Sequence, residues 1–172
     1  MNAYSNDFTQ AVKFTAKWEG FFSNDSVDPG GKTKYGISDA GDGTVDGLID
    51  LDRDGDGDVP VEELTQEQAV EYLYNHYWRA SGCDAIAGGD NAVRGKQLGL
   101  AIAVFDTAVN CGVNRALRWA HDAATVQGFL ELRRQHYFRI IANNPSLGKY
   151  KKGWLNRLND LSKYVAILDA PT

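Results

Sequence analysis

A short acidic segment constrains this chain more than any other part of it. Residues 52–63 read D-R-D-G-D-G-D-V-P-V-E-E, in which carboxylates recur around a central glycine. Calcium is a hard cation that takes about six to eight oxygen ligands, and a glycine allows the sharp turn that brings them together. The segment therefore predicts a loop folded around Ca²⁺, with the ligands Asp52, Asp54, Asp56, Asp58 and Glu63.

The spacing resembles that of an EF-hand calcium loop. Gly57 takes the sixth position, Asp58 offers its backbone carbonyl at the seventh, and Glu63 supplies the closing carboxylate at the twelfth. Pro60 has no side-chain oxygen, so a water molecule is expected at the ninth position. The loop lacks a clear entering helix, which argues against a calcium sensor and favours a structural ion. The alternative is a solvated acidic loop without an ion.

Charge is distributed unevenly along the chain. The formal net charge is -5, yet residues 39–63 hold ten acids against one base, and residues 111–172 hold ten Lys or Arg against four acids. A basic body with one acidic insert suits an anionic polymer as partner, although basic helices can also be no more than solvated faces. We expect a monomer with no nucleic acid partner and no integral membrane contact.

The sequence shows no pattern of a signal peptide or membrane span, and it contains two cysteines. Residues 1–20 contain no long apolar stretch, and the longest apolar run, Leu100 to Phe105, is too short to span a bilayer. We therefore expect a protein that is made soluble in a cytoplasm without a signal peptide. Cys83 and Cys111 lack metal-ligand spacing; free thiols are the default, and a disulfide is the alternative in an oxidising compartment.

The apolar spacing predicts a mainly helical chain with a small irregular or β lobe. A first helix is expected to stop at Gly20, and residues 21–38 indicate a loop with a short hairpin. Thr65 and Gln68 form a capping box that starts another helix. Leu98 to Val109 is apolar almost all round, as in a buried central helix. Further helices are expected over residues 114–120, 126–142 and 154–168.

Glu19 is the residue whose setting most resembles that of a catalytic acid. It stands at the expected C-terminal end of the first helix, between Trp18 and two phenylalanines. The negative end of a helix dipole disfavours a carboxylate, and aromatic neighbours desolvate it, so both effects should raise its pKa. A raised pKa is what a general acid needs near neutral pH, whereas the ordinary alternative is a surface charge.

The sequence around Glu19 resembles the N-terminal signature of glycoside hydrolase family 108. Residues 18–38 read W-E-G-F-F-S-N-D-S-V-D-P-G-G-K-T-K-Y-G-I-S, which contains that family's Glu-Gly, Asp-Pro-Gly-Gly and Thr-Lys-Tyr-Gly-Ile elements. Phe21 and Phe22 stand where the family has Gly-Tyr, and the Tyr77-Trp78 pair is also similar. The family comprises peptidoglycan-degrading N-acetylmuramidases, so the resemblance implies a lysozyme-like helical fold.

The resemblance continues beyond the acidic insert. Residues 105–112 are similar to the family's D-x-A-V-N-x-G element, and residues 153–157 to its G-W-x-x-R element. These elements belong to a helical segment, here residues 92–172, that is often named a peptidoglycan-binding module. Residues 114–126 are shorter than the usual pattern. We therefore interpret residues 1–172 as a single lysozyme-like catalytic domain with a calcium-loop insert at 39–64.

The resemblance implies roles for individual residues. Glu19 aligns with the catalytic acid, and Asp28 follows at a spacing similar to that of the second carboxylate in phage-type lysozymes, although Asp-Pro-Gly-Gly also forms a turn by itself. Asp106 and Asn110 share one face of an apolar helix, so they should line a cleft or be hydrogen-bonded inside. Trp78 is expected to stack on a sugar or pack in the core. The expected substrate-binding residues are Thr33, Tyr35, Trp78, Asp106 and Asn110.

The function implied is that of a phage endolysin that cuts bacterial peptidoglycan between N-acetylmuramic acid and N-acetylglucosamine. Such an enzyme waits in the host cytoplasm and acts on periplasmic peptidoglycan after the membrane is permeabilised. A lytic transglycosylase is one alternative, because it would need Glu19 but not Asp28. A calcium-dependent peptidoglycan-binding protein without turnover is another, and it would make Glu19 dispensable.

Overall fold

The structure is a computed structural model that describes residues 4–19, 33–38, 46–88 and 97–169. The described chain is mainly helical, with small two-stranded antiparallel sheets, so the predicted fold class is confirmed. It divides into two compact units, residues 1–80 and 81–172, which are called here the N-terminal and C-terminal units. None of the described helices is both long and apolar enough to cross a membrane.

The N-terminal unit combines two helical segments with short hairpins. Helix α1 covers Asn6–Glu19, and a hairpin pairs β1 (Thr33–Lys34) with β2 (Ile37–Ser38). A second hairpin pairs β3 (Leu48–Ile49) with β4 (Val59–Pro60), and it encloses the acidic loop. The remaining elements are the 3-10 turn η2 (Val61–Glu63), helix α2 (Gln66–Leu73) and the π-helical turn η3 (Tyr74–Arg79).

Aromatic residues form the core of the N-terminal unit. Phe8 of α1 packs edge-on against Tyr74 and Trp78 of η3, with ring centroids 4.9 and 5.5 Å away. The predicted capping box at the start of α2 is confirmed, because Thr65 and Gln68 each accept a hydrogen bond from the other's backbone amide. The loop and helix are therefore connected through a well-defined helix start.

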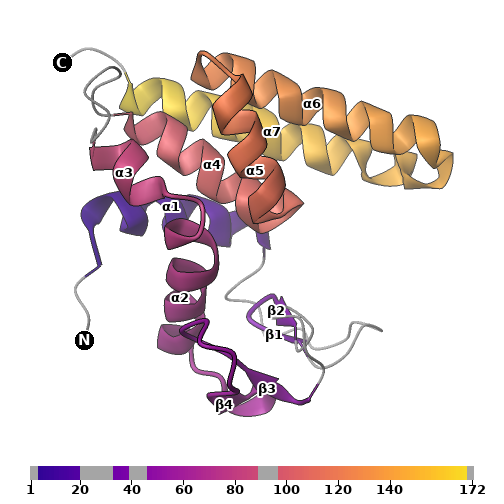
Figure 1. Cartoon of the computed structure of the whole chain (residues 1–172). Coiled ribbons are helices and arrows are strands. Elements are labelled where there is room, and N and C mark those ends of the chain that lie inside the picture. The colour runs from indigo at the N-terminus through magenta and orange to yellow at the C-terminus, as the bar shows by residue number, and fades with distance from the viewer. Residues whose placement is uncertain (1–3, 20–32, 39–45, 89–96, 170–172) are drawn as a thin grey trace. The chain divides into compact units, whose positions relative to one another are not determined.

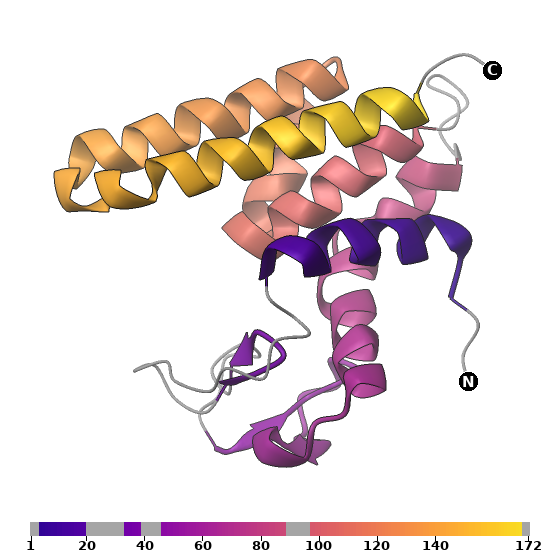
Figure 2. The same cartoon turned by 180° about the vertical axis from the view of Figure 1, so that it is seen from behind.

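All the secondary-structure elements in the described part of the C-terminal unit are helical. Its elements are α3 (Cys83–Gly88), α4 (Leu98–Cys111), α5 (Val113–Asp122), α6 (Val126–Asn143), η4 (Pro145–Tyr150) and α7 (Lys151–Leu168). Figures 1 and 2 show α6 and α7 side by side, and α4 packs against both.

Helix α4 is the centre of this unit, as its apolar sequence predicts. Every residue from 99 to 108 is buried, and Gly112 ends the helix with a φ of 91°, which a side chain would disfavour. Helix α7 begins three residues earlier than expected, because η4 leads directly into it. Cys83 and Cys111 are both free thiols, as the default reading predicted.

Candidate active site and acidic loop

Helix α1 presents the predicted catalytic acid at its last residue. Glu19 ends α1, which confirms the expected position at a helix C-terminus. Phe8 and Ala11 place the buried face of the helix against the aromatic core, while Trp18 near its end is half-buried beneath the ammonium group of Lys17. The carboxylate of Glu19 and the whole of Asp28 lie outside the described residues, so their roles stay predictions.

The β1–β2 hairpin carries the next part of the signature. Its two turn residues, Tyr35 and Gly36, have φ values of 53° and 74°. Positive φ at both central positions is the geometry of a type I′ turn, which suits the twist of a two-residue hairpin. The Nζ of Lys34 donates a hydrogen bond to the carbonyl of Glu62 at 2.7 Å, so the hairpin is fastened to η2.

Tyr35 and Thr33 occupy different positions in this hairpin. The Tyr35 ring is half-buried and lies 5.6 Å from the ammonium group of Lys34. Thr33 pairs with Ser38 across the hairpin through its backbone, and its side chain lies outside the described residues. The expected contact of these two residues with substrate stays a prediction.

Trp78 belongs to the core and not to a sugar-binding surface. Its side chain is 0% exposed and meets Phe8 edge-on within the aromatic cluster. Helical spacing places Trp78 on the apolar face of its helix. It does not tell whether that part of the face is buried in the core or lines a cleft. The expected stacking of Trp78 on substrate is therefore corrected to core packing.

The acidic loop brings three carboxylates together. One carboxylate oxygen each from Asp50, Asp52 and Asp58 lies within 4.8 Å of the others. Asp52 and Asp58 belong to the predicted ligand set, whereas Asp50 does not. Asp54, Asp56 and Glu63 are exposed and lie outside this group of three. The arrangement can hold a cation that prefers oxygen ligands.

The backbone of the loop follows a register two residues earlier than predicted. Asp50 is buried and its carboxylate accepts hydrogen bonds from the amides of Arg53 and Gly55, at 2.6 and 3.1 Å. Gly55, with a φ of 96°, makes the turn that the sequence pattern assigned to Gly57. Gly57 has another role, because a Cβ at this position would clash with the Leu48 side chain.

The sequence contains a signal for this earlier register. The pattern D-x-D-x-D-G starts at Asp50 as well as at Asp52, and only the later start also finds an acid at the twelfth position. In the structure, a further carboxylate oxygen, Oδ2 of Asp58, accepts a hydrogen bond from the amide of Leu51 at 2.6 Å. The carboxylates of Asp50 and Asp58 therefore hold the loop backbone, and the expected role of Glu63 as a ligand stays a prediction.

Two side chains of η3 hold the start of the loop. Nε2 of His76 lies 2.6 Å from the carbonyl oxygen of Asp50, and Asn75 donates from Nδ2 to the carbonyl of Leu51 at 2.9 Å. The His76 ring is stacked on Tyr72 at 3.9 Å. Sequence spacing gave no role to His76, because the contact spans 26 residues.

The neighbouring acids of the loop act on the pKa of Asp56. The pKa of Asp56 is raised by a side-chain hydrogen bond with Asp54 and by the charge of that residue, with smaller contributions from Asp58 and Asp52. Each of these groups makes ionisation of Asp56 less favourable. A cation among these carboxylates would relieve that repulsion.

Asp106 lies at the centre of a buried ion-pair network in the C-terminal unit. Its side chain is 0% exposed, and its two oxygens accept hydrogen bonds at 2.7 Å from Arg133 of α6 and Arg157 of α7. Burial alone would raise the pKa of Asp106, but the charges and hydrogen bonds of the two arginines outweigh it and lower the pKa. Of the two expectations for Asp106, cleft lining is therefore wrong and internal hydrogen bonding is confirmed.

Asn110 continues the network toward the surface. Its Oδ1 accepts hydrogen bonds from Arg133 at 3.2 Å and from the Tyr137 hydroxyl at 2.7 Å. Burial raises the pKa of Tyr137 to about 12, so this hydroxyl stays protonated and donates. Asn110 is exposed, so its side chain is accessible to a ligand, and its expected contact with substrate stays a prediction.

The sequence pattern did not predict that Arg133 and Arg157 are the partners of Asp106. Arg157 stands in the G-W-x-x-R element and Arg133 in the middle of α6, 51 and 27 residues from Asp106. The available signal was an acid on an otherwise apolar helix, which requires a buried cation. That requirement does not identify which of the C-terminal basic residues supplies it.

Comparison with known proteins gives one match. Residues 12–112 match the family described as Glycosyl hydrolase 108, and this range spans more than half of the chain, including Glu19, the β1–β2 hairpin and α4. No curated protein and no solved structure matches the chain significantly. On the strength of residues 12–112, the chain belongs to glycosyl hydrolase family 108.

Proposed function

We propose that the protein is a muramidase that hydrolyses bacterial peptidoglycan between N-acetylmuramic acid and N-acetylglucosamine, as a phage endolysin. The observation that carries this proposal is the family match over residues 12–112, in which Glu19 closes α1. Membership of a glycosyl hydrolase family makes a polysaccharide the substrate class, and the signature around Glu19 favours the peptidoglycan glycan strand.

Two carboxylates carry the proposed chemistry. Glu19 protonates the glycosidic oxygen as the bond to the sugar carbon breaks. Asp28 stabilises the positive charge that develops on that carbon or activates the attacking water. Tyr35, Thr33 and Asn110 are the further residues to which the proposal gives a role in binding the sugar chain. The position of Glu19 at a helix C-terminus supports this assignment, because the helix dipole there favours the protonated carboxyl.

The same proposal includes a structural calcium ion in the acidic loop. The donor set fits, since three carboxylates offer oxygens within 4.8 Å of one another. Asp50, Asp52 and Asp58 would hold the ion, and Asp54, Asp56 and Glu63 remain further ligands to test. The ion would order the β3–β4 hairpin, which leads directly into η2, and η2 in turn accepts the hydrogen bond from Lys34.

The proposal also covers the organisation and the place of action. Residues 1–172 form one lysozyme-like catalytic domain with its insert at residues 39–64, and the protein acts as a monomer. It is made in the host cytoplasm and reaches periplasmic peptidoglycan once the membrane is permeabilised.

Product analysis tests the proposal directly. Purified peptidoglycan is digested with the protein, and the soluble fragments are identified by mass spectrometry after borohydride reduction. Fragments that end in N-acetylmuramitol, the reduced form of a reducing N-acetylmuramic acid end, support the muramidase. A 1,6-anhydro end would make the protein a lytic transglycosylase, and an absence of fragments despite binding would make it a non-catalytic binding protein.

A further inference from the structure

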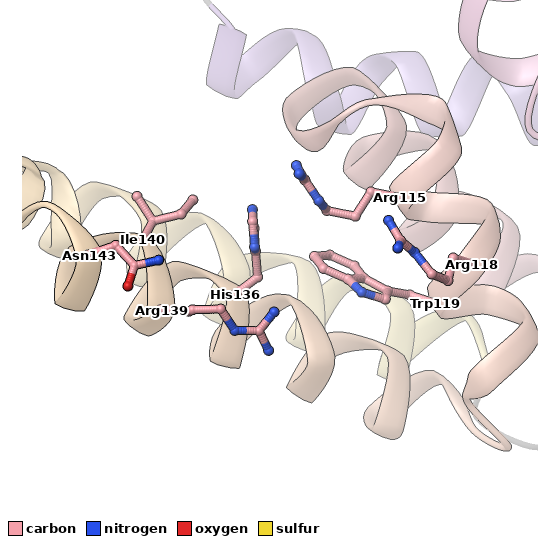
Figure 3. A pocket seen from close by; sticks show the side chains of 7 residues that line it. All are labelled: Arg115, Arg118, Trp119, His136, Arg139, Ile140 and Asn143. Atoms are coloured by element: carbon pink, nitrogen blue, oxygen red, sulfur yellow. The ribbon is translucent and has the colours of Figure 1, made fainter.

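A cavity in the C-terminal unit lies apart from the network around Asp106. It opens between α5 and α6 and has a volume of about 380 Å³, within the range of small-molecule sites (Figure 3). Residues at helical spacing on the two facing helices line it, so both walls are fixed by regular structure. The lining residues that matter here are Arg115, Arg118, Trp119, His136, Arg139 and Asn143.

Among the described residues that line this cavity, three are arginines and none carries a carboxylate. Arg118 and Arg139 make no ion pair or hydrogen bond with any described residue, and Arg115 donates one hydrogen bond, from Nη1 to the carbonyl of Cys111 at 2.8 Å. Arg133 and Arg157, by contrast, both form ion pairs with Asp106. The guanidinium groups of Arg115, Arg118 and Arg139 therefore line the cavity, and no side chain in its lining compensates their charge.

His136 adds a neutral polar group to this wall. Desolvation, followed by the charges of Arg115, Arg139 and Arg133, lowers the pKa of His136 to about 4, so the imidazole is neutral at neutral pH. A neutral ring offers one donor and one acceptor. The ring lies 5.3 Å from the half-buried indole of Trp119, which supplies an apolar wall beside the charged groups (Figure 3).

We propose that this cavity binds a phosphorylated sugar. Guanidinium groups match phosphate oxygens through paired, charge-assisted hydrogen bonds, and a phosphate monoester carries about -1.5 to -2 charges on three terminal oxygens. A carboxylate offers one charge and two oxygens. Three guanidinium groups provide more positive charge and more hydrogen-bond donors than one carboxylate can match. Trp119 provides the flat apolar face on which a sugar ring stacks, and Asn143 provides a polar group for its hydroxyls. The site is independent of the proposed lytic activity.

Calorimetric titration of the full chain tests this assignment. Glucose 6-phosphate is titrated at low ionic strength. Inorganic phosphate and glucose, which represent its two chemical parts, are titrated separately as controls. We expect glucose 6-phosphate to bind more tightly than inorganic phosphate, and glucose to give no measurable binding. Trp119→Ala should weaken glucose 6-phosphate and leave inorganic phosphate unchanged, because only the sugar contacts the indole.

A charge-matched pair of variants locates the site. Arg118→Gln with Arg139→Gln removes two charges from the cavity without removing a hydrogen bond or ion pair between described residues, and at least about a tenfold loss of affinity is expected, the scale of losing charge-assisted hydrogen bonds. Lys151→Gln with Lys152→Gln removes the same charge from the start of α7, outside the cavity, and should retain the affinity. Unchanged melting temperatures verify that both variants are folded.

Three results would overturn the proposal. One is the absence of binding heat for both glucose 6-phosphate and inorganic phosphate, and another is an equal loss of affinity in the Lys151 and Lys152 variant. The third is tighter binding of N-acetylmuramoyl dipeptide than of glucose 6-phosphate with the same dependence on Arg118 and Arg139, which would assign the cavity to carboxylates of peptidoglycan. None of these readouts depends on lysis, so failure here is distinguishable from failure of the proposed muramidase.

Discussion

Asp106 and Arg157 form a buried ion pair that joins α4 to α7, with Nη2 of the arginine 2.7 Å from Oδ1 of the carboxylate. Arg133 occupies the other oxygen, so one carboxylate connects three helices of the C-terminal unit. Both arginine side chains are almost fully buried. Removal of the acid would therefore leave two cations in a medium that solvates them poorly.

We expect Asp106→Asn to destabilise the protein by about 3–5 kcal/mol, the usual scale for breaking a buried charge pair by removing one partner. Urea denaturation at neutral pH measures this loss. Glu131→Gln is the matched control, because it removes a carboxylate from an exposed pair with Arg134 and should cost at most about 1 kcal/mol. Equal, small losses in both variants would mean that the network adds little to stability.

The same network predicts a dependence of stability on pH. The folded-state pKa of Asp106 is lowered, so its contribution is fully present above its unfolded pKa of about 3.9 and is lost as pH falls through the lower folded value. The difference in unfolding free energy between the wild type and Asp106→Asn should therefore be constant from neutral pH down to about pH 5 and shrink below about pH 4. A constant difference down to pH 2 would contradict this.

Much of the fold was predictable because it depends on local signals. The C-terminal ends of α4 and α6 follow from Gly112 and from the Asn143-Asn144-Pro145 stop, which act within one helical turn. The capping box at Thr65 is equally local. Local chemistry therefore identified where most helices begin and end.

The interactions of the site residues were less predictable than the helices, because their partners are distant in the sequence. The arginines that neutralise Asp106 come from other helices, and apolar periodicity gives Trp78 the same face whether it packs inside or meets a sugar. The register of the acidic loop was ambiguous because D-x-D-x-D-G occurs twice, two residues apart. Burial of Asp50 and the packing of Leu48 on Gly57 distinguish the two registers, and both are tertiary features.

The proposed general acid makes a sharp prediction. Glu19→Gln should lower the rate of lysis of outer-membrane-stripped cells by at least about two orders of magnitude, because a glutamine cannot donate the proton. Its melting temperature should stay within the range of the wild type. Glu67→Gln in the exposed first turn of α2 is the control and should lyse normally. Normal lysis by Glu19→Gln would remove this residue from the mechanism.

Asp28→Asn separates a catalytic role from a turn-forming role. A second catalytic carboxylate predicts that activity falls by about two orders of magnitude or more while the melting temperature is unchanged. Asparagine also forms turns, so the backbone of Asp-Pro-Gly-Gly should tolerate the change. A lower melting temperature with normal activity per folded molecule would instead assign Asp28 to the turn and leave another group beside Glu19.

Calcium should stabilise the fold, and the loop register predicts which acids matter. An ion that binds only the folded state adds about 2.7 kcal/mol at a hundred times its dissociation constant, so a chelator should lower the melting temperature. If Asp50, Asp52 and Asp58 hold the ion, Asp50→Asn should abolish the response to calcium while Glu63→Gln retains it. Glu62→Gln, an exposed neighbour in η2, is the control for charge alone. Loss of the response in Glu63→Gln but not in Asp50→Asn would restore the later register, and identical melting curves of the wild type with chelator and with millimolar calcium would rule out the ion.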